Sequence, residues 1–248
     1  MLQKNHKKYG LVGKSLNHSF SKGFFEEYFS SNNIEAEYEN IEIQEINEIK
    51  LILKGQFSGL NVTIPYKEKI IPFLDELSSE AKNIEAVNVV EFKDGKAIGH
   101  NTDAYGFRFS IKPFLTNQHE RAVIFGTGGA SKAIEFVLKS LGIDVIYISR
   151  NPREGQFTYE DVNEHMTRSC KLWVNCTPVG TFPNIEDCLP ISFEYLTKEH
   201  LVVDLIYNPD KTLFLKRAEE KGAMILNGAS MLKHQALKSW EIWNDGNN

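Results

Sequence analysis

Strongly apolar runs that recur along the second half of the chain place the tightest limit on its fold. These runs are Val123-Ile124-Phe125, Val145-Ile146-Tyr147-Ile148, Leu172-Trp173-Val174, Leu201-Val202-Val203 and Met224-Ile225-Leu226. Apolar residues in direct succession are typical of a strand that is buried on both faces. Helical stretches separate some of the runs, including Ala130 to Leu141 and Thr212 to Lys221. The repeated β-α-β pattern predicts an α/β protein with a parallel, doubly wound sheet.

The first half of the chain follows a different pattern. Strand-like stretches, among them Tyr9 to Gly13 and Leu60 to Ile64, alternate with helix-like ones, and Asp94-Gly95 is a strong hairpin signal. We expect the boundary between the halves within Ala104 to Leu115, which is itself a predicted helix. The last predicted helix, Ser230 to Trp243, carries an apolar stripe that the second half does not obviously need. We therefore expect it to pack back on the first half, which would make that domain discontinuous in sequence.

Composition narrows the class of protein. The chain has 248 residues and a net charge of −5. This charge argues against a general nucleic-acid binder, because such proteins usually carry a basic face. Its cysteines, Cys170, Cys176 and Cys188, show no CxxC spacing and are expected to be reduced thiols, and no histidines have metal-ligand spacing. No apolar run approaches the ~20 residues of a membrane helix. We expect a cytoplasmic protein that binds no metal, no nucleic acid and no membrane.

A glycine-rich turn follows the first apolar run of the second half. Its sequence is Gly126-Thr127-Gly128-Gly129-Ala130-Ser131, and a predicted helix begins there. Gly126 permits a tight turn, Gly128 lets a pyrophosphate approach the backbone, and the helix N-terminus offers free N–H groups. The pattern predicts a dinucleotide-binding turn, although an ordinary strand-to-helix turn has the same general form.

The residues after the next strand indicate which dinucleotide binds. An NAD enzyme usually has Asp or Glu at this point, but the chain has Ser149-Arg150-Asn151. The Arg150 guanidinium suits a 2′-phosphate, and Ser149 offers a further donor. NADP is therefore favoured over NAD, with a solvated surface arginine as the alternative.

Two polar segments in the first half carry the candidate chemistry. Asn61-Val62-Thr63-Ile64-Pro65-Tyr66-Lys67 and Asn101-Thr102-Asp103-Ala104-Tyr105-Gly106 each begin where an apolar strand ends. A cationic lysine beside a ketone oxygen can stabilise its negative charge and supply a proton, so Lys67 is the candidate acid–base group. Asp103 would position Lys67, although alone it would fit a helix N-cap equally well.

Other polar residues fit a hydroxylated, acidic substrate. Asn61, Thr63 and Asn88 stand at or near strand ends, where Asn88 could also be a satisfied core amide. In His18-Ser19-Phe20-Ser21, two hydroxyls could bind a carboxylate or cap the following helix. Gln235 sits beside the apolar stripe of the last helix and could reach a hydroxyl.

Taken together, these motifs resemble the shikimate dehydrogenase family. The matching segments occur in the family's order: His-Ser-Phe-Ser, Asn-Val-Thr-Ile-Pro-Tyr-Lys, Ala-Val-Asn, Asn-Thr-Asp-Ala-Tyr-Gly, Gly-Thr-Gly-Gly-Ala-Ser, Asn-Cys-Thr-Pro-Val-Gly, Tyr-Asn-Pro and Met-Leu-Lys-His-Gln. The resemblance implies reversible NADPH-dependent reduction of 3-dehydroshikimate to shikimate, in chorismate and aromatic amino-acid biosynthesis. It implies a substrate-binding domain over residues 1–103 and 229–248 and a Rossmann-type NADP-binding domain over residues 104–228.

The resemblance also assigns residue roles. It implies that Lys67 and Asp103 form the catalytic pair. The implied substrate ligands are Ser19 and Ser21 for the carboxylate, and Asn61, Thr63, Asn88, Asp103, Tyr207 and Gln235 for the ring substituents. The implied cofactor-lining residues are Gly126, Gly128, Gly129, Ala130, Ser149, Arg150, Thr177 and Gly228.

The chain departs from the family pattern at a few positions, and alternatives stay open. Lys22 stands where the family usually has Pro, and Val89 where it usually has Thr. One alternative is a quinate/shikimate dehydrogenase that uses NAD. Another is a non-catalytic relative that binds a nucleotide or a shikimate-like ligand as a regulator. The expected state of assembly is a monomer or a homodimer.

Overall fold

The computed structural model describes residues 7–16, 19–55 and 57–244, so that His18 lies outside the described residues. The chain divides into two compact units. The first contains Met1–Tyr105 and Gln235–Asn248, and the second contains Gly106–His234. The chain passes between them within helix α4 (Asp103–Ile111) and within helix α8 (Ala229–Asn244). The assignment of substrate to one unit and cofactor to the other stays a prediction.

The first unit is built on a mixed sheet with the strand order β2-β1-β3-β5-β6-β4. Its strands are β1 (Lys7–Gly13), β2 (Ala36–Glu42), β3 (Gly59–Val62), β4 (Glu76–Leu77), β5 (Val89–Lys93) and β6 (Lys96–His100). β1 runs parallel to β2 and β3, whereas β5 is antiparallel to both β3 and β6. The predicted hairpin joins β5 to β6, with φ of 51° at Asp94 and 75° at Gly95. A positive φ at both central residues is what a tight two-residue hairpin turn requires.

Short helices connect these strands. They are α1 (Phe20–Ser31), α2 (Ile49–Leu53) and α3 (Ser79–Ile84), with single 3₁₀ turns at Ile46–Glu48 and Ile71–Phe73. Successive strand residues face opposite sides of the sheet, and β1 shows this plainly. Tyr9 and Leu11 pack in one core cluster with Phe25 of α1, whereas Val12 packs in the other with Ile49 of α2.

The end of α8 belongs to the core of the first unit. Trp243 is stacked on Tyr9 with ring centroids 4.8 Å apart, and its Nε1 donates to the carbonyl of Val90 at 3.1 Å. A Cβ on Gly59 would overlap the Trp243 ring, so only glycine fits there. The prediction that the last helix packs on the first half of the chain is confirmed for its segment from Gln235 onward.

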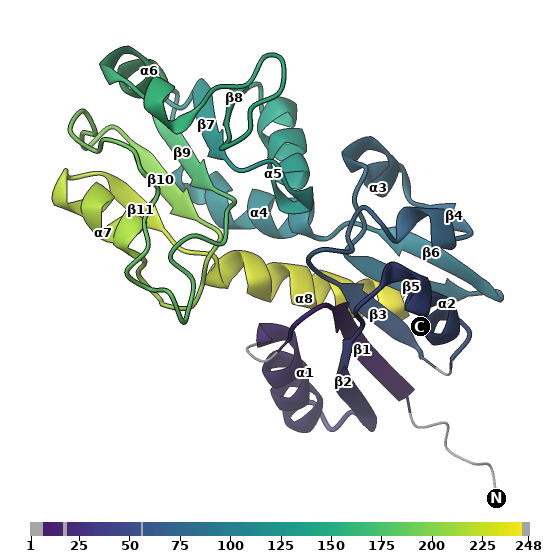
Figure 1. The fold of residues 1–248 in the computed structure, drawn as a ribbon. Helices are drawn as coiled ribbons and strands as arrows, with labels where there is room; N and C mark the ends of the chain where they lie inside the picture. Colours follow the sequence, from purple (N-terminus) through teal and green to yellow (C-terminus); the bar gives the residue numbers. More distant parts are fainter. Residues whose placement is uncertain (1–6, 17–18, 56, 245–248) are drawn as a thin grey trace, which may run out of the picture. The chain divides into compact units, whose positions relative to one another are not determined.

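The second unit contains the predicted parallel sheet, with the order β11-β10-β9-β7-β8 (Figure 1). The strands are β7 (Arg121–Phe125), β8 (Asp144–Ile148), β9 (Leu172–Asn175), β10 (Leu201–Asp204) and β11 (Met224–Leu226). Every pairing is parallel, which confirms the doubly wound fold class. The strand order reverses between β7 and β9. In such sheets, ligands bind outside the carboxyl ends of the strands at this switch point.

Helices cover both faces of this sheet. α5 (Gly129–Ser140) joins β7 to β8, and α7 (Leu213–Glu220) joins β10 to β11. Crossovers between parallel strands are almost always right-handed. The two crossovers here run in opposite directions along the sheet, and α5 and α7 lie on its opposite faces (Figure 1).

The remaining connections of the second unit are less regular. They include α6 (Glu164–Ser169) and 3₁₀ turns at Lys112–Phe114 and Tyr159–Asp161. The segment between β9 and β10 contains no helix, and its buried Leu189, Phe193 and Leu196 pack in the core cluster that includes Trp173 and Phe214.

Candidate functional site

Lys67 and Asp103 form an ion pair in the first unit. The Nζ of Lys67 donates to the Oδ2 of Asp103 at 2.6 Å. The Asp103 side chain is only 2 % exposed and that of Lys67 is 14 % exposed. An ammonium group held by a buried carboxylate can deliver a proton to a bound molecule from a fixed position. The structure thus brings together the two residues that the sequence singled out.

The backbone around Lys67 is fixed on both sides. β3 ends at Val62, and a turn follows in which the N–H of Tyr66 donates to the carbonyl of Thr63 at 2.9 Å. The buried Tyr66 hydroxyl donates to the carbonyl of Ile43 at 2.6 Å. The carbonyl of Lys67 accepts from the N–H of Val87 at 2.8 Å. These contacts hold the start of the Lys67 side chain while leaving its ammonium partly open to solvent.

Asp103 is held by Asn88 rather than acting as the cap of α4. The Nδ2 of Asn88 donates to the Oδ1 of Asp103 at 2.9 Å, and Asn101 accepts from the first-turn N–H of Ala104 at 3.2 Å. Both carboxylate oxygens of Asp103 therefore have side-chain donors, Asn88 on one and Lys67 on the other.

Asn88 is also bonded to three further groups. Its Nδ2 lies 3.0 Å from the Oγ1 of Thr102 and 3.2 Å from the Oε1 of Gln235, and its Oδ1 accepts from the N–H of Thr102 at 2.7 Å. The two N–H groups of Asn88 are therefore shared among three acceptors, in Thr102, Asp103 and Gln235. Direct binding of substrate by Asn88 stays a prediction.

Asn61 lies at the end of β3 in a second set of buried contacts. Its Oδ1 accepts from the Tyr38 hydroxyl at 2.7 Å, and its Nδ2 donates to the Oγ of Ser239 at 3.0 Å. Burial raises the pKa of Tyr38, so this phenol stays protonated and donates. Ser239 is fully buried, and its hydroxyl donates to the carbonyl of Gln235 at 2.8 Å.

Sequence reasoning missed both Tyr38 and Ser239. Tyr38 has the appearance of an ordinary strand residue, and Ser239 follows Gln235 by one helical turn on α8. That spacing, which places two polar residues on one face of an otherwise apolar stripe, was the available signal for Ser239.

The two serines before α1 differ in their roles. Ser19 is the N-cap of α1, and its hydroxyl accepts from the N–H of Lys22 at 3.5 Å. Ser21 lies in the first turn and forms a hydrogen bond with Tyr38, which lowers the pKa of that phenol against the larger effect of burial. Tyr38 therefore joins Ser21 to Asn61. Thr63 is half-buried and follows β3 directly. A Cβ added to Gly13 would lie 2.8 Å from the methyl carbon of Thr63.

The glycine-rich turn lies at the carboxyl end of β7 in the second unit. Gly126 has a φ of +99°, Gly128 is the N-cap of α5, and Gly129 and Ala130 form the first turn of that helix. A Cβ on Gly128 would meet no atom within 4 Å, so the space beside its backbone is open. The Ser131 hydroxyl folds back to the carbonyl of Gly128 at 2.6 Å. An open glycine backbone at a helix N-terminus fits the pyrophosphate of a dinucleotide.

Thr177 and Gly228 lie against neighbouring backbone in the same unit. The methyl carbon of Thr177 is 2.9 Å from the Cβ position of Gly126. Thr177 follows β9 and Gly126 follows β7, so the two flank the switch point of the sheet. A Cβ on Gly228 would overlap the carbonyl oxygen of Leu205, which excludes any larger residue there.

Ser149 and Arg150 follow β8 as predicted. Ser149 is buried, and its hydroxyl accepts from the N–H of Asn151 at 3.3 Å. Arg150 is exposed, and its positive charge acts on Tyr159, where it opposes the effect of burial on the pKa of that phenol. An exposed guanidinium at this strand end is suited to a phosphate.

Tyr207 belongs to the second unit, just after β10, whereas the other predicted substrate ligands belong to the first.

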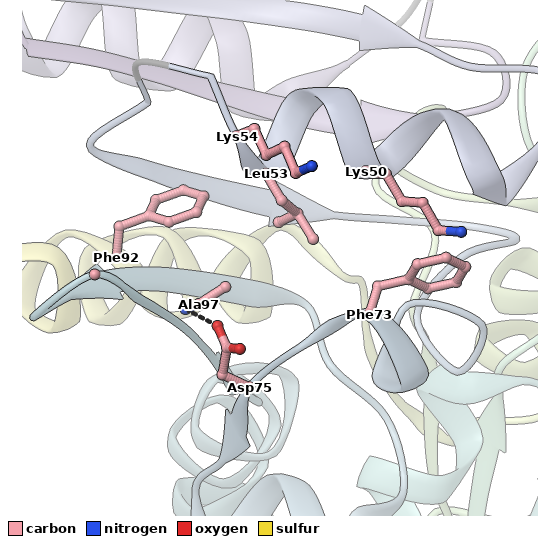
Figure 2. A pocket seen from close by; sticks show the side chains of 8 residues that line it. Lys50, Leu53, Lys54, Phe73, Asp75, Phe92 and Ala97 are labelled. Atoms are coloured by element: carbon pink, nitrogen blue, oxygen red, sulfur yellow. Dashed lines mark hydrogen bonds between the residues drawn. The ribbon is translucent and has the colours of Figure 1, made fainter.

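Figure 2 shows a pocket of the first unit that these residues do not line. It is lined by Lys50, Leu53, Lys54, Phe73, Asp75, Phe92, Gly95 and Ala97. It contains none of the predicted site residues, and Asp75 there accepts from the N–H of Ala97 at 2.8 Å.

Two further observations concern the described residues alone. No group of three or more His, Cys, Asp or Glu side chains in that part of the chain could hold a metal ion. None of the helices in residues 7–16, 19–55 and 57–244 is long and apolar enough to cross a membrane.

Comparison with known proteins places this geometry in a family. Residues 11–90 match the model of the shikimate dehydrogenase substrate binding domain. A shikimate dehydrogenase (NADP(+)) of Clostridium botulinum strain Hall is 37% identical over 246 residues, which cover 94% of this chain and 95% of the relative.

Solved structures agree with the sequence comparison. Shikimate dehydrogenase 1 from Peptoclostridium difficile has a TM-score of 0.87 at 36% identity, covering 96% of this chain and 92% of that chain. The Thermus thermophilus shikimate 5-dehydrogenase in complex with NADP(H) and shikimate has a TM-score of 0.85 at 30% identity, covering 96% and 94%. The chain belongs to the shikimate dehydrogenase family.

Proposed function

We propose that this protein is an NADP-dependent shikimate dehydrogenase, an oxidoreductase that reversibly reduces the ketone of 3-dehydroshikimate to the alcohol of shikimate. The observation that carries the proposal is the pair formed by Lys67 and Asp103, with 2.6 Å between Nζ and Oδ2, inside a cluster of buried amides and hydroxyls. Relatives of this family with 37% identity over nearly the whole chain are NADP(+)-dependent shikimate dehydrogenases.

The chemistry assigned to the first unit is proton transfer. When bound, NADPH supplies the hydride. The Lys67 ammonium stabilises the negative charge on the substrate oxygen and donates the proton that completes the alcohol. Asp103 holds Lys67 in place through the bond between Nζ and Oδ2, and in the reverse direction the neutral Lys67 amine takes the proton back. Asn88 holds the carboxylate of Asp103 at 2.9 Å, which limits the positions that the pair can adopt.

Substrate recognition uses the groups around this pair. Ser19 and Ser21 bind the substrate carboxylate. Asn61, Thr63, Asn88, Asp103 and Gln235 of the first unit bind ring substituents. The Nε2 of Gln235 has no acceptor among the described residues, because only its Oε1 is engaged by Asn88, and it is therefore available to a substrate hydroxyl.

Cofactor binding is assigned to the second unit. The turn from Gly126 to Ala130 binds the pyrophosphate, Arg150 and Ser149 bind the 2′-phosphate, and Thr177 and Gly228 line the remaining surface. The enzyme is expected to act in the cytoplasm as a monomer or homodimer, without nucleic-acid or membrane partners.

The direct test follows absorbance at the nicotinamide band with purified protein, shikimate and either NADP or NAD. The proposal expects turnover with NADP and shikimate that clearly exceeds turnover with NAD. Quinate in place of shikimate tests the quinate/shikimate dehydrogenase alternative, which predicts comparable turnover of quinate with NAD. Absence of turnover with any pair, alongside measurable binding of shikimate, would instead support a regulatory relative.

A further inference from the structure

Asp204 is a fully buried carboxylate at the carboxyl end of an internal strand in the parallel sheet of the second unit. It is the last residue of β10, which lies between β9 and β11. Burial raises its pKa to about 6, so the group is still ionised at neutral pH. A buried charge is costly unless donors surround it. Asp204 has three donors: the N–H of Ile206 at 3.1 Å, the Nδ2 of Asn175 at 3.1 Å and the hydroxyl of Thr212 at 2.6 Å.

The donor from Asn175 links Asp204 to Thr177. Since the Nδ2 of Asn175 faces Asp204, its Oδ1 faces the loop after β9. There it accepts from the N–H of Thr177 at 3.0 Å and from the Thr177 hydroxyl at 2.7 Å. The methyl carbon of Thr177 in turn lies 2.9 Å from the Cβ position of Gly126. An acceptor at position 204 therefore sets the orientation of the Asn175 amide and, through it, the position of Thr177.

The donor from Ile206 links Asp204 to Gly228. The bond to the N–H of Ile206 fixes the backbone that leaves β10. Within this segment the Leu205 carbonyl oxygen lies directly against Gly228, where it leaves no room for a Cβ, and the Ile206 carbonyl accepts from the N–H of Gly228 at 3.0 Å. One carboxylate thus holds two separate segments that are assigned to the cofactor site.

We infer that Asp204 is a positioning residue for NADP. Asp204 does not contact the cofactor turn itself. It holds Thr177 through the side chain of Asn175, and it holds Gly228 through the backbone that follows β10. The inference rests on the assignment of the cofactor to the second unit. It adds Asp204 and Asn175 to the residues on which cofactor affinity depends.

The third donor provides a matched control. Thr212 is the N-cap of α7, and its hydroxyl accepts from the N–H of Leu215 at 3.3 Å while donating to Asp204. Thr212→Val removes one donor from the same carboxylate and leaves the contacts through Asn175 and Ile206 in place. A purely structural role of Asp204 predicts that loss of Thr212 and loss of Asn175 have similar consequences. The positioning role predicts that only loss of Asn175 affects NADP.

The experiment measures three quantities for each full-length variant: the dissociation constant of NADPH by fluorescence titration, that of shikimate by calorimetry, and the midpoint of urea unfolding. Asn175→Leu is expected to weaken NADPH binding about tenfold or more, because it removes the acceptor of both Thr177 donors. Shikimate binding should stay unchanged. Thr212→Val should lower the unfolding midpoint and leave NADPH binding within about twofold of wild type.

Asp204→Asn shows whether NADPH binding depends on the acceptor that orients the Asn175 amide or on the negative charge of Asp204. Its Oδ1 can still accept from Asn175 and Ile206 while its Nδ2 donates to Thr212, so NADPH affinity should stay close to wild type, whereas Asp204→Leu should weaken it as Asn175→Leu does. If Asp204→Leu does not fold, Thr177→Val serves as the second variant. It removes the hydroxyl that donates to Asn175 at 2.7 Å and accepts from the N–H of Val179 at 3.3 Å, and it keeps the backbone bond of Thr177 to Asn175, so it should weaken NADPH binding by a smaller factor. Unchanged NADPH affinity in Asn175→Leu, or equal weakening in Thr212→Val, would overturn the inference. Failure of the wild type to bind NADPH would overturn the proposed cofactor assignment itself.

Discussion

The side chain of Asn88 donates a hydrogen bond to the Oδ1 of Asp103 at 2.9 Å, on the carboxylate oxygen that Lys67 leaves free. A buried carboxylate with a fixed donor on each oxygen has little freedom to rotate. The position of the Lys67 ammonium therefore depends on Asn88 as well as on Asp103.

Removal of this donor should reduce turnover. Asn88→Ala leaves the Oδ1 of Asp103 without its donor, and a hydrogen bond to a charged group contributes about 1.5–3 kcal/mol. We expect kcat to fall by about 10- to 100-fold, with the KM for NADP unchanged. Steady-state kinetics with a thermal melt of the variant checks this. A folded Asn88→Ala protein with the kcat of wild type would show that Asn88 does not position Asp103.

Arg150 should determine the choice between NADP and NAD. Arg150→Ala removes a charged partner of the 2′-phosphate, so the KM for NADP should rise by about 10- to 100-fold while that for NAD barely changes. Arg153→Ala is the matched control, because Arg153 is also exposed and follows the same strand. Equal changes for both cofactors, or an equal effect of Arg153→Ala, would exclude Arg150 as the phosphate ligand.

Gln235 should affect substrate alone. Gln235→Ala removes the free Nε2 amide and one acceptor of Asn88, and we expect shikimate binding to weaken by about tenfold. NADPH binding should be unaffected, because Gln235 belongs to the first unit and the cofactor turn to the second. Calorimetric titration of each ligand into the variant separates the two effects. An unchanged affinity for shikimate would remove Gln235 from the site.

His200 should make folding stability depend on pH. Its Nδ1 accepts from the N–H of Thr197 at 3.0 Å, and burial lowers its pKa below 6.5. Because the unfolded chain takes up the proton first, the stability contributed by His200 is complete above about pH 6.5 and is lost as the pH falls toward the lowered folded pKa. Urea unfolding between about pH 8 and about pH 5.5 measures this loss.

The control for His200 is an asparagine. His200→Asn keeps an acceptor for Thr197 but does not titrate, so its free energy of unfolding should fall less steeply with decreasing pH. Asp204, whose folded pKa is raised to about 6, changes stability in the opposite direction, but it is present in both proteins and cancels in the comparison. Identical pH dependence of the two proteins would show that His200 is not responsible.

Much of the second unit could be predicted from the sequence. Its strands are continuous apolar runs because they are buried on both faces, and burial leaves a direct record in residue type. The two-residue strand β4 and the short helices α3 and α6 were not predicted, because elements of this length carry little periodicity. The segment between β9 and β10 covers the sheet with Leu189, Phe193 and Leu196 in irregular structure, which no periodic pattern reveals.

The candidate site was predictable only where polar residues interrupt apolar strands. Lys67 and Asp103 stood out for that reason. Tyr38 and Ser239 did not, because their importance comes from contacts with Asn61, which is 178 residues from Ser239 in sequence. Asp204 follows an apolar run, so the sequence shows it only as a polar residue at a strand end. Its three hydrogen-bond donors become visible only in the structure.

The central claim, that Lys67 is the acid–base group, is tested most directly by kcat and shikimate affinity measured on the same Lys67→Ala protein. Loss of a general acid–base group typically lowers the rate by about 10²–10⁴-fold, and we expect a loss of that size in kcat with a much smaller change in the dissociation constant of shikimate. Lys69→Ala, which removes an exposed lysine two residues further on, should leave both quantities unchanged. A Lys67→Ala enzyme that turns over at nearly the wild-type rate would contradict the account.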